Sequence, residues 1–449
     1  MKADFVYYLE QDEEPDTVEL DAETLQEFIK AHQARKAEYD ELENLYIGKH
    51  PILEQAPKAA YKPDNRLVVN FPKYIVDTFN GFFMGKPVKV THDDMATNEF
   101  LDVLHKMNNQ DDNNAEMSKM CDIFGHAYEL VFTDEEGEIG IAPLDPREAF
   151  IIVDNSIRKR TLFGVRYYKH GEDIVGTISD AHQITDFIIG DDDLKFGEVT
   201  PHQFGDVPMI EYVANKERQG IFEPVVSLIE AYNKTLSEKA NDVDYFADAY
   251  LVILEALLDK EQLRQLRDNR TINMTSREDG HKIDIKFLEK PNADETQENL
   301  LETLKKMIFQ IAMVANISDE NFGVESGVSL DYKLKPMSDL AATRERKFIA
   351  GMNRRYRMIG NLGGNKLSND NWIKLEYIFT RNLPANLEAE ANVIQKVTGT
   401  IPDEYIFKMS SMIDDVQEAM LKAKEMETVE PDDEYDFNKV DDSNDDIDK

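Results

Sequence analysis

Hydrophobic residues recur at helical spacing in the first part of the chain. Residues 21–46 place apolar or aromatic side chains near every third or fourth position, and Asp21 can cap the N-terminus of a helix. These positions are Leu25, Ile29, His32, Tyr39 and Leu42. The pattern predicts a long helix over 21–46, and residues 65–81 then predict a short extended piece that enters a second helix.

Residues 124–213 show a different pattern, typical of strands. Apolar runs at 127–132, 149–153, 162–168 and 184–189 alternate with turn signals such as Glu136-Gly137 and Asp154-Asn155. Together with the helical segments before them, these runs predict a mixed α+β domain over 48–215.

The middle of the chain predicts two long amphipathic helices. From Pro224 to Tyr250 the apolar positions step by three or four residues, and the same holds from Asn292 to Ala315. The insert between them, 254–291, predicts a short helix at 259–268 and two strands, 271–275 and 282–287, joined around Asp279-Gly280. Two long helices that bracket a small α/β insert predict a stalk with a tip.

A third long helix is predicted at about 337–359, and it is rich in basic residues. These are Arg344, Arg346, Lys347, Arg354, Arg355 and Arg357. The helix could grip phosphates, but a strongly acidic chain favours ion pairs within or between subunits, so we expect these residues at subunit contacts. A strand at 372–380 and helices around 385–398 and 402–426 follow.

Composition and charge narrow the function classes. The chain has 51 Lys and Arg against 89 Asp and Glu, a formal net charge of −38. This balance argues against a freestanding DNA-binding module, which needs clustered basic residues. The single cysteine, Cys121, excludes an intrachain disulfide and a multi-thiolate zinc site.

The ends of the chain and its apolar runs add further expectations. The first ten residues lack the apolar core of a signal peptide, and the longest apolar stretches are too short to span a bilayer, so we expect a soluble intracellular protein without membrane contact. Residues 425–449 hold 12 acidic residues and two lysines. We expect this tail to be disordered, and residues 427–449 to be dispensable for assembly.

The sequence contains no convincing catalytic or ligand-binding motif. Residues 81–87, GFFMGKP, have the wrong glycine spacing for a phosphate-binding loop, and residues 323–327, GVESG, place serine too late for a nucleophile elbow. Asp284 and Lys286 on one strand are too short a motif for a metal-dependent nuclease. The sequence therefore predicts no catalytic residue, no metal site and no cofactor.

An ordered series of segments resembles the portal proteins of long-tailed bacteriophages, the head–tail connector family. The series covers about residues 22–420. Its segments are 65–78 (NRLVVNFPKYIVDT), 81–88 (GFFMGKPV), 125–130 (GHAYEL), 144–148 (LDPRE), 229–233 (IEAYN), 240–242 (AND), 246–251 (FADAYL), 326–328 (SGV), 332–334 (YKL) and 377–381 (YIFTR).

The resemblance implies an α+β portal subunit with named parts. Residues 1–223 and 331–383 would form the wing, 224–253 and 292–316 the two stem helices, 254–291 the clip, and 384–426 a small helical crown before the acidic tail, 427–449. Residues 317–330 would form a tunnel loop that faces DNA. The residues expected there are Asp319, Glu320, Asn321, Val324, Glu325, Ser326 and Val328.

The implied function is structural. Portals form rings, usually of twelve subunits, at one capsid vertex, and double-stranded DNA passes through them during packaging and ejection. The implied partners are other copies, the terminase large subunit, the major capsid and scaffolding proteins, and a head-completion or tail adaptor protein. The protein would reside in the virion, and in the host cytoplasm during assembly. The alternatives are a nuclease or other enzymatic subunit of the packaging motor, and an acidic scaffold or adaptor without a channel.

Overall fold

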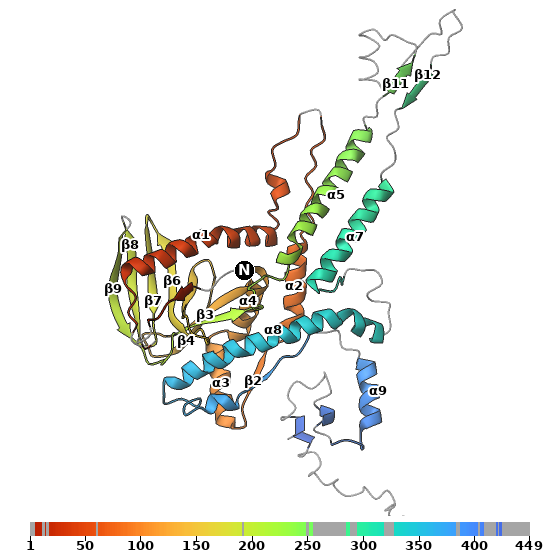
Figure 1. Cartoon of the computed structure of the whole chain (residues 1–449). Helices are drawn as coiled ribbons and strands as arrows, with labels where there is room; N and C mark the ends of the chain where they lie inside the picture. The colour runs from red at the N-terminus through yellow and green to blue at the C-terminus, as the bar shows by residue number, and fades with distance from the viewer. Residues whose placement is uncertain are drawn as a thin grey trace, which may run out of the picture. The chain divides into compact units, whose positions relative to one another are not determined.

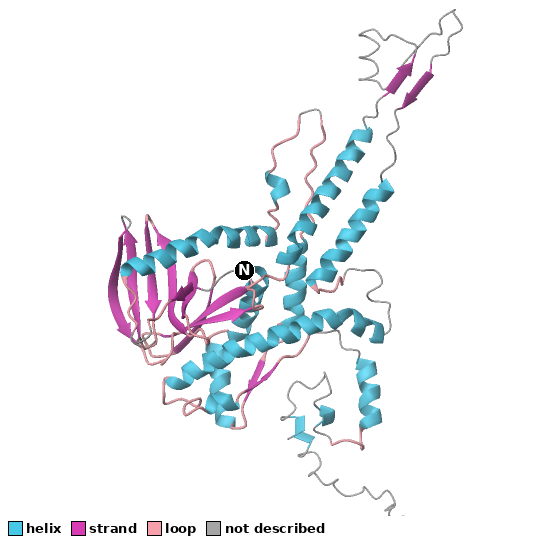
Figure 2. Cartoon of the chain, in the orientation of Figure 1, coloured by secondary structure: helices cyan, strands magenta, loops and turns pink. Residues whose placement is uncertain are grey.

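The structure is a computed structural model that divides the chain into two units, Met1–Asn382 and Leu383–Lys449 (Figure 1). It describes residues 5–10, 14, 18–59, 62–190, 193–247, 251–254, 284–287, 294–317, 327–382, 387–402, 405–407, 419–420 and 422–423. Helices and strands are mixed in the first unit (Figure 2), which confirms the predicted α+β class.

A six-stranded sheet and the first helix form one packed body. The sheet order is β1 (Phe5–Tyr7), β5 (Ala149–Asp154), β6 (Thr161–His170), β7 (Asp173–Ser179), β8 (Gln183–Gly190) and β9 (Asp193–Pro201). Strand β1 is parallel to β5, and the remaining neighbours are antiparallel. Helix α1 (Ala22–Tyr46) buries Leu25 and Ile29 in the same hydrophobic cluster as Phe150. The predicted helix at 21–46 is confirmed, including its Asp21 cap, which accepts a hydrogen bond from the Thr24 amide.

The second sheet is smaller and lies among helices. Strand β3 (His126–Thr133) is central, between β10 (Met209–Val213) and β4 (Ile139–Leu144). Helices α4 (Gln110–Phe124) and α8 (Gly327–Asn361) pack against it, and α2 (Phe71–Phe83) and α3 (Met95–Met107) pack against α4. A two-stranded ribbon joins β2 (Lys89–Thr91) to β13 (Glu376–Ile378). The strand predicted at 372–380 is shorter than expected, because residues 371–374 form a 3-10 turn.

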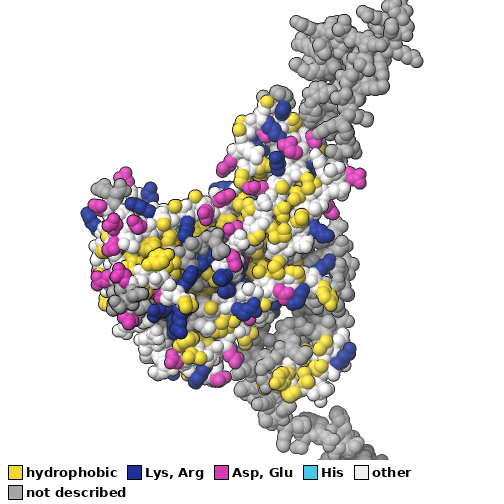
Figure 3. Space-filling model, viewed as in Figure 1, with side chains coloured by type: hydrophobic (Ala, Val, Ile, Leu, Met, Phe, Trp, Pro, Cys, Tyr) yellow, Lys and Arg dark blue, Asp and Glu magenta, His cyan; other side chains and the backbone are white. Residues whose placement is uncertain are grey.

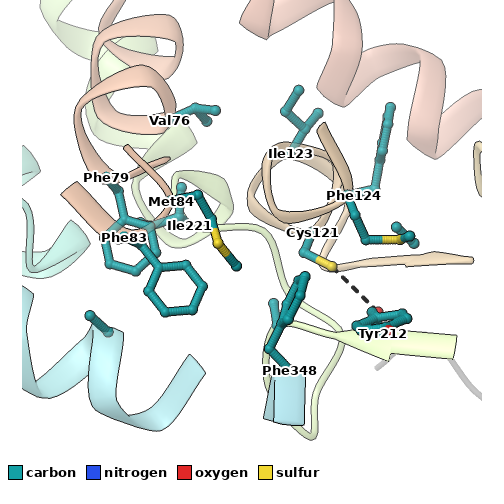
Figure 4. Close-up of a cluster of buried hydrophobic side chains, with 14 of the residues drawn as sticks. Val76, Phe79, Phe83, Met84, Cys121, Ile123, Phe124, Tyr212, Ile221 and Phe348 are labelled. Carbon is teal, nitrogen blue, oxygen red and sulfur yellow. Dashed lines mark hydrogen bonds between the residues drawn. The ribbon is translucent and has the colours of Figure 1, made fainter. Parts of the chain in front are cut away.

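The main hydrophobic core lies where these helices meet the second sheet. In Figure 4, Phe79 and Phe83 of α2 lie near Phe348 of α8, and Cys121 of α4 faces Tyr212 of β10. The Cys121 thiol donates a hydrogen bond to the Tyr212 carbonyl at 3.4 Å. Gly125, which ends α4 at φ +86°, packs so tightly that an added Cβ would lie 2.1 Å from the Arg218 carbonyl oxygen.

The stalk consists of two neighbouring antiparallel helices, α5 (Val226–Ala247) and α7 (Asp294–Ala312). A short 3-10 turn, Glu223–Val225, leads into α5. The stem segment predicted at 224–253 is only partly helical, because its last three residues lie in strand β11 (Leu251–Leu254), which pairs with β12 (Asp284–Phe287). The predicted helix at 259–268 and strand at 271–275 lie outside the described residues.

Helix α8 begins earlier than the sequence predicts. The sequence predicts a start at about residue 337, whereas α8 begins at Gly327 and includes Pro336. In the second unit, α9 (Leu387–Val397) confirms the helix predicted around 385–398, whereas most of the helix predicted at 402–426 lies outside the described residues.

Candidate functional site

The basic residues of α8 divide into buried and exposed groups. Arg344 is buried, and its Nη2 lies 2.8 Å from Oδ1 of the equally buried Asp122 on α4. Burial raises the pKa of Asp122 to about 7, although Arg344 opposes that rise. Because this pair is sealed inside one subunit, the prediction that Arg344 contacts a neighbouring subunit is wrong.

Arg355 forms a second buried ion pair, about three helical turns after Arg344 on α8. Its Nε lies 2.7 Å from Oε1 of Glu129 on β3, and its Nη2 donates to Glu129 and, at 2.9 Å, to Asn114 on α4. Both Arg355 and Glu129 have no exposed side-chain surface. The predicted subunit contact is therefore wrong for Arg355 also, and the two pairs instead join α8 to α4 and to the second sheet.

Arg354 and Arg357 lie at the surface and share one carboxylate. Arg354 contacts Asp206 at 2.9 Å and donates to Thr161 Oγ1 at 2.9 Å, while Arg357 forms an ion pair with the same Asp206. These contacts are also within the chain. Arg346 is exposed and donates to Thr343 at 3.2 Å, and Lys347 is half-buried, so a subunit contact stays a prediction for these two residues.

The predicted tunnel loop is mostly outside the described residues. Asp319, Glu320, Asn321, Val324, Glu325 and Ser326 all lie in the segment 318–326. Val328 lies in the first turn of α8, which begins at Gly327. The expectation of a loop through Leu330 is therefore wrong for its last four residues, which are helical.

An extended segment, residues 65–69, runs along α5 and is held there by three polar side chains. The side chains lie at positions i, i+4 and i+8 of the helix and accept hydrogen bonds from every second backbone amide of the segment. The bonds join Val69 N to Asn233 Oδ1 (2.8 Å), Leu67 N to Ser237 Oγ (2.9 Å) and Asn65 N to Asn241 Oδ1 (2.6 Å). All three acceptor side chains are buried.

The hydrophobic pattern of the chain does not predict this ladder, although the sequence contains a signal for it. One helical turn and two extended residues advance similar distances, about 6 Å and about 7 Å, so buried Asn and Ser at i, i+4 and i+8 can pair with alternate amides of a strand-like segment. Polar residues on the otherwise apolar side of a predicted helix indicate a backbone partner of this kind.

Helix α7 has apolar side chains on two neighbouring faces. Leu301, Leu304 and Ile308 are buried. Leu300, Met307 and Ile311, also at helical spacing, are 44–48% exposed. Polar contacts at the far end of the stalk join the helices, with an ion pair between Lys239 and Glu298 and a hydrogen bond from Gln297 to Asp242 at 3.2 Å.

The described residues assemble no reactive centre. Burial raises the pKa of Cys121 to about 12, so its thiol stays protonated at neutral pH. Among the described residues, no group of three or more His, Cys, Asp or Glu side chains could hold a metal ion. None of the helices in the described part of the chain has the length and apolar content that crossing a membrane requires. What this geometry offers is surfaces: an exposed apolar face on α7 and a basic end of α8.

Comparison with known proteins decides the family. Residues 25–430 match the family described as phage portal protein, SPP1 Gp6-like. The chain belongs to this family. It is 24% identical to a portal protein of Clostridium phage phiCD119 over 454 aligned residues, which cover 93% of this chain and 99% of that protein. It is also 24% identical to the portal protein of Bacillus phage SPP1, over 81% of this chain and 76% of that protein.

Membership confirms the resemblance drawn from the sequence and gives the chain a structural role in the phage. Phage portal proteins are components of the virion capsid rather than enzymes. The surfaces described above are therefore candidates for protein–protein contact.

Proposed function

We propose that copies of this chain form a ring at one capsid vertex. The ring encloses a channel through which double-stranded DNA enters during packaging and leaves during ejection. It also provides the docking surface for the terminase and for the tail connector. Family membership supports the portal role, and one observation on this chain supports the ring itself.

That observation is the second apolar face of α7. Leu300, Met307 and Ile311 form a stripe (i, i+7, i+11) that one copy leaves exposed. Three large apolar side chains in a row on a stalk helix are costly in water and are typical of a surface that another subunit covers. In a ring, the stripe of each copy would pack against the next copy.

The ring also gives a reason for the acidity of the chain. Phosphates bind to clustered Lys and Arg with release of counterions, and each such contact slows a sliding duplex. A channel built from a chain of net charge −38 offers few such contacts. The duplex can then move under the force of a separate ATP-driven motor.

Charge substitution on the stripe tests the ring. The variant Met307→Asp/Ile311→Asp places two carboxylates in the proposed interface, and we expect monomers or small oligomers where the unchanged chain gives large rings. Native mass spectrometry measures the subunit number, and negative-stain images show whether a central hole is present. The control is Glu302→Gln/Lys306→Gln, two exposed positions of α7 away from the stripe, which leaves the net charge unchanged.

The control variant should form rings of the same size as the unchanged chain. Circular dichroism of each variant establishes that α5 and α7 remain folded. Intact rings from a folded Met307→Asp/Ile311→Asp variant would show that this face of α7 is not the subunit interface.

A further inference from the structure

The turn between β5 and β6 is basic although the chain as a whole is acidic. Arg158, Lys159 and Arg160 follow one another there, and all three are exposed. Ile157, immediately before them, is fully exposed as well. Figure 3 shows Lys and Arg side chains gathered where the end of α8 meets the six-stranded sheet.

This turn forms one wall of a pocket of about 430 Å³. Arg354 and Arg357 of α8 also line it, and so do the apolar residues Leu162 and Phe163. Five basic side chains line the pocket against two acidic ones, Asp180 and Asp206. We call this site the basic pocket.

The geometry holds three of the five basic side chains in place. Asp206 holds both arginines of α8, and Arg354 also donates to Thr161 Oγ1. Across the pocket, Arg160 Nε lies 3.1 Å from the buried carboxylate of Asp154. Guanidinium groups that are fixed in this way lose less side-chain freedom when an acidic ligand arrives, which favours binding.

The most acidic segment of the chain has the matching chemistry. Residues 427–449 contain eleven Asp and Glu and two Lys, with Tyr435 and Phe437 among the acids. We propose that the basic pocket binds this segment of a neighbouring copy. The carboxylates would pair with the basic side chains, and an aromatic ring would lie against Ile157 or the apolar lining.

We place the bound segment on a neighbouring copy because of the net charge of each copy, and this part of the proposal rests on the proposed ring. Copies that each carry a net charge of −38 repel one another when they assemble. Contact between the most acidic segment of one copy and a basic surface of the next reduces that repulsion. The affinity of the pocket for the segment, in contrast, does not depend on the ring and can be measured without it.

A peptide ligand suits this pocket better than duplex DNA. A duplex presents a rigid row of phosphates, whereas the pocket is concave, includes two carboxylates and begins one residue after the exposed Ile157. An acidic chain with aromatic side chains can enter the concavity and cover the isoleucine. A duplex can do neither.

Peptide binding is the direct test. A fluorescent synthetic peptide of residues 427–449 is titrated into the chain truncated after Met426, with fluorescence anisotropy as the readout. We expect saturable binding that weakens as salt rises, and binding about tenfold weaker in Arg158→Glu/Lys159→Glu. The matched control is Lys169→Glu/Lys195→Glu, which reverses two exposed charges of the same sheet outside the pocket.

Three results would overturn the basic pocket as the binding site. They are no saturable binding, an equal loss of affinity in the pocket variant and in the control variant, and tighter binding of a short DNA duplex than of the peptide. A peptide with Tyr435→Ser/Phe437→Ser should bind several-fold more weakly than the original peptide. Equal affinity of the two peptides would remove the aromatic contact from the proposal.

Isotopic labelling identifies the source of the segment. Rings are assembled from ¹⁵N-labelled copies truncated after Met426 and unlabelled full-length copies, and are then treated with a carbodiimide that joins Lys to nearby Asp or Glu. A link between labelled Lys159 and an unlabelled residue of 427–449 is between copies by construction, and we expect to find it. Peptide binding without such a link in intact rings would overturn the neighbouring copy as the source, whereas absence of rings would count against the proposed function alone.

Discussion

Arg354 and Arg355 are adjacent on α8 and lie in opposite environments. Arg355 and its partner Glu129 are completely buried, whereas Arg354 and Asp206 keep about a fifth of their side-chain surface exposed, 20% and 19%. Burial removes the water that would otherwise solvate each charge, so Arg355 depends on Glu129 far more than Arg354 depends on Asp206. The two arginines should therefore differ strongly in their effect on stability.

We expect Arg355→Met to lower the free energy of unfolding by about 3–5 kcal/mol, because it leaves Glu129 buried without its partner. Arg354→Met, the matched control, should cost about 1 kcal/mol or less. The double variant Arg355→Met/Glu129→Leu should recover most of the loss, since no unpaired charge then stays in the core. Urea unfolding followed through Trp372, the single tryptophan, measures all three. Equal losses in the two single variants would contradict the argument.

Glu211 on β10 provides a test by pH. Burial alone would raise its pKa, but hydrogen bonds from Arg218 and His126 outweigh burial and lower the pKa to about 2 from an ordinary value of 4.5. A carboxylate with a lowered pKa in the folded state stabilises the fold at pH values above 4.5. That contribution is lost as the pH falls from 4.5 towards 2.

We therefore expect Glu211→Gln to be less stable than the unchanged chain at pH 7, by about 3 kcal/mol if the full shift is lost. The difference between the two proteins should narrow as the pH falls from about 5 to about 3, because protonation removes the advantage of the carboxylate. Urea unfolding at several pH values gives this difference. A gap that stays constant with pH would show that Glu211 is not ionised in the folded protein.

At the scale of elements, the ladder between residues 65–69 and α5 fixes the base of the stalk. Each of the three bonds uses a partly buried backbone amide, and an amide left there without a partner is costly. The segment thus serves as a strand whose hydrogen-bonding neighbour is a row of helix side chains. Nothing local in either sequence requires the other, since they lie about 170 residues apart along the chain.

Removing one acceptor should release one amide of the ladder. We expect Asn233→Ala to speed hydrogen exchange at the Val69 amide by about tenfold or more, because the bond from that amide is worth about 1–3 kcal/mol. The Asn65 amide, two bonds away, should change less. The control is Thr235→Ala on the same helix, whose hydroxyl bonds only to the Ala231 carbonyl of α5 in the described structure. Unchanged exchange at Val69 would show that the bond does not hold the segment.

Periodicity predicts elements that bury a face of their own. It predicts α1, α5 and α7 because each has an apolar stripe, and it predicts β5, which is buried throughout. It does not predict β7, where Gly176 interrupts the pattern, or β9, which is almost entirely exposed. These strands form because backbone hydrogen bonds extend the sheet beyond its core. Such bonds do not require an alternating pattern of hydrophobic side chains, so the sequence does not reveal them.

Proline residues and ion-pair partners from distant parts of the chain limit what the sequence predicts about α8. The sequence predicts a helix start at about residue 337, yet α8 begins at Gly327 and includes Pro336, because proline lacks one hydrogen bond without forbidding the helix. The ionic character of α8 is visible in the sequence, but its partners Asp122, Glu129 and Asp206 come from distant elements. Only the fold separates arginines that are sealed in the core from those that line the basic pocket.

At the scale of the whole molecule, the net charge of −38 is consistent with the proposed channel. A passage for DNA works when no part of it binds phosphate strongly, and the predicted tunnel loop fits that requirement. The ionisable side chains of residues 318–330 are Asp319, Glu320 and Glu325, all acidic. Repulsion from these acids and weak apolar contact from Val324 would keep a duplex centred without holding it.

Reversing these charges should turn the passage into a binding site. In a ring of Asp319→Lys/Glu320→Lys/Glu325→Lys, each copy adds three lysines around one short length of duplex, and each neutralised phosphate strengthens binding through counterion release. We expect normal rings, packaging lowered about tenfold or more, and partial recovery as ionic strength rises, because salt weakens the contacts that counterion release favours. Nuclease protection of packaged DNA measures the yield.

The matched control, Glu172→Lys/Asp193→Lys/Glu198→Lys, makes the same charge change at exposed positions of the six-stranded sheet and should package normally. Equal packaging by the loop variant and the control, with intact rings in both, would place residues 318–330 away from the path of the DNA.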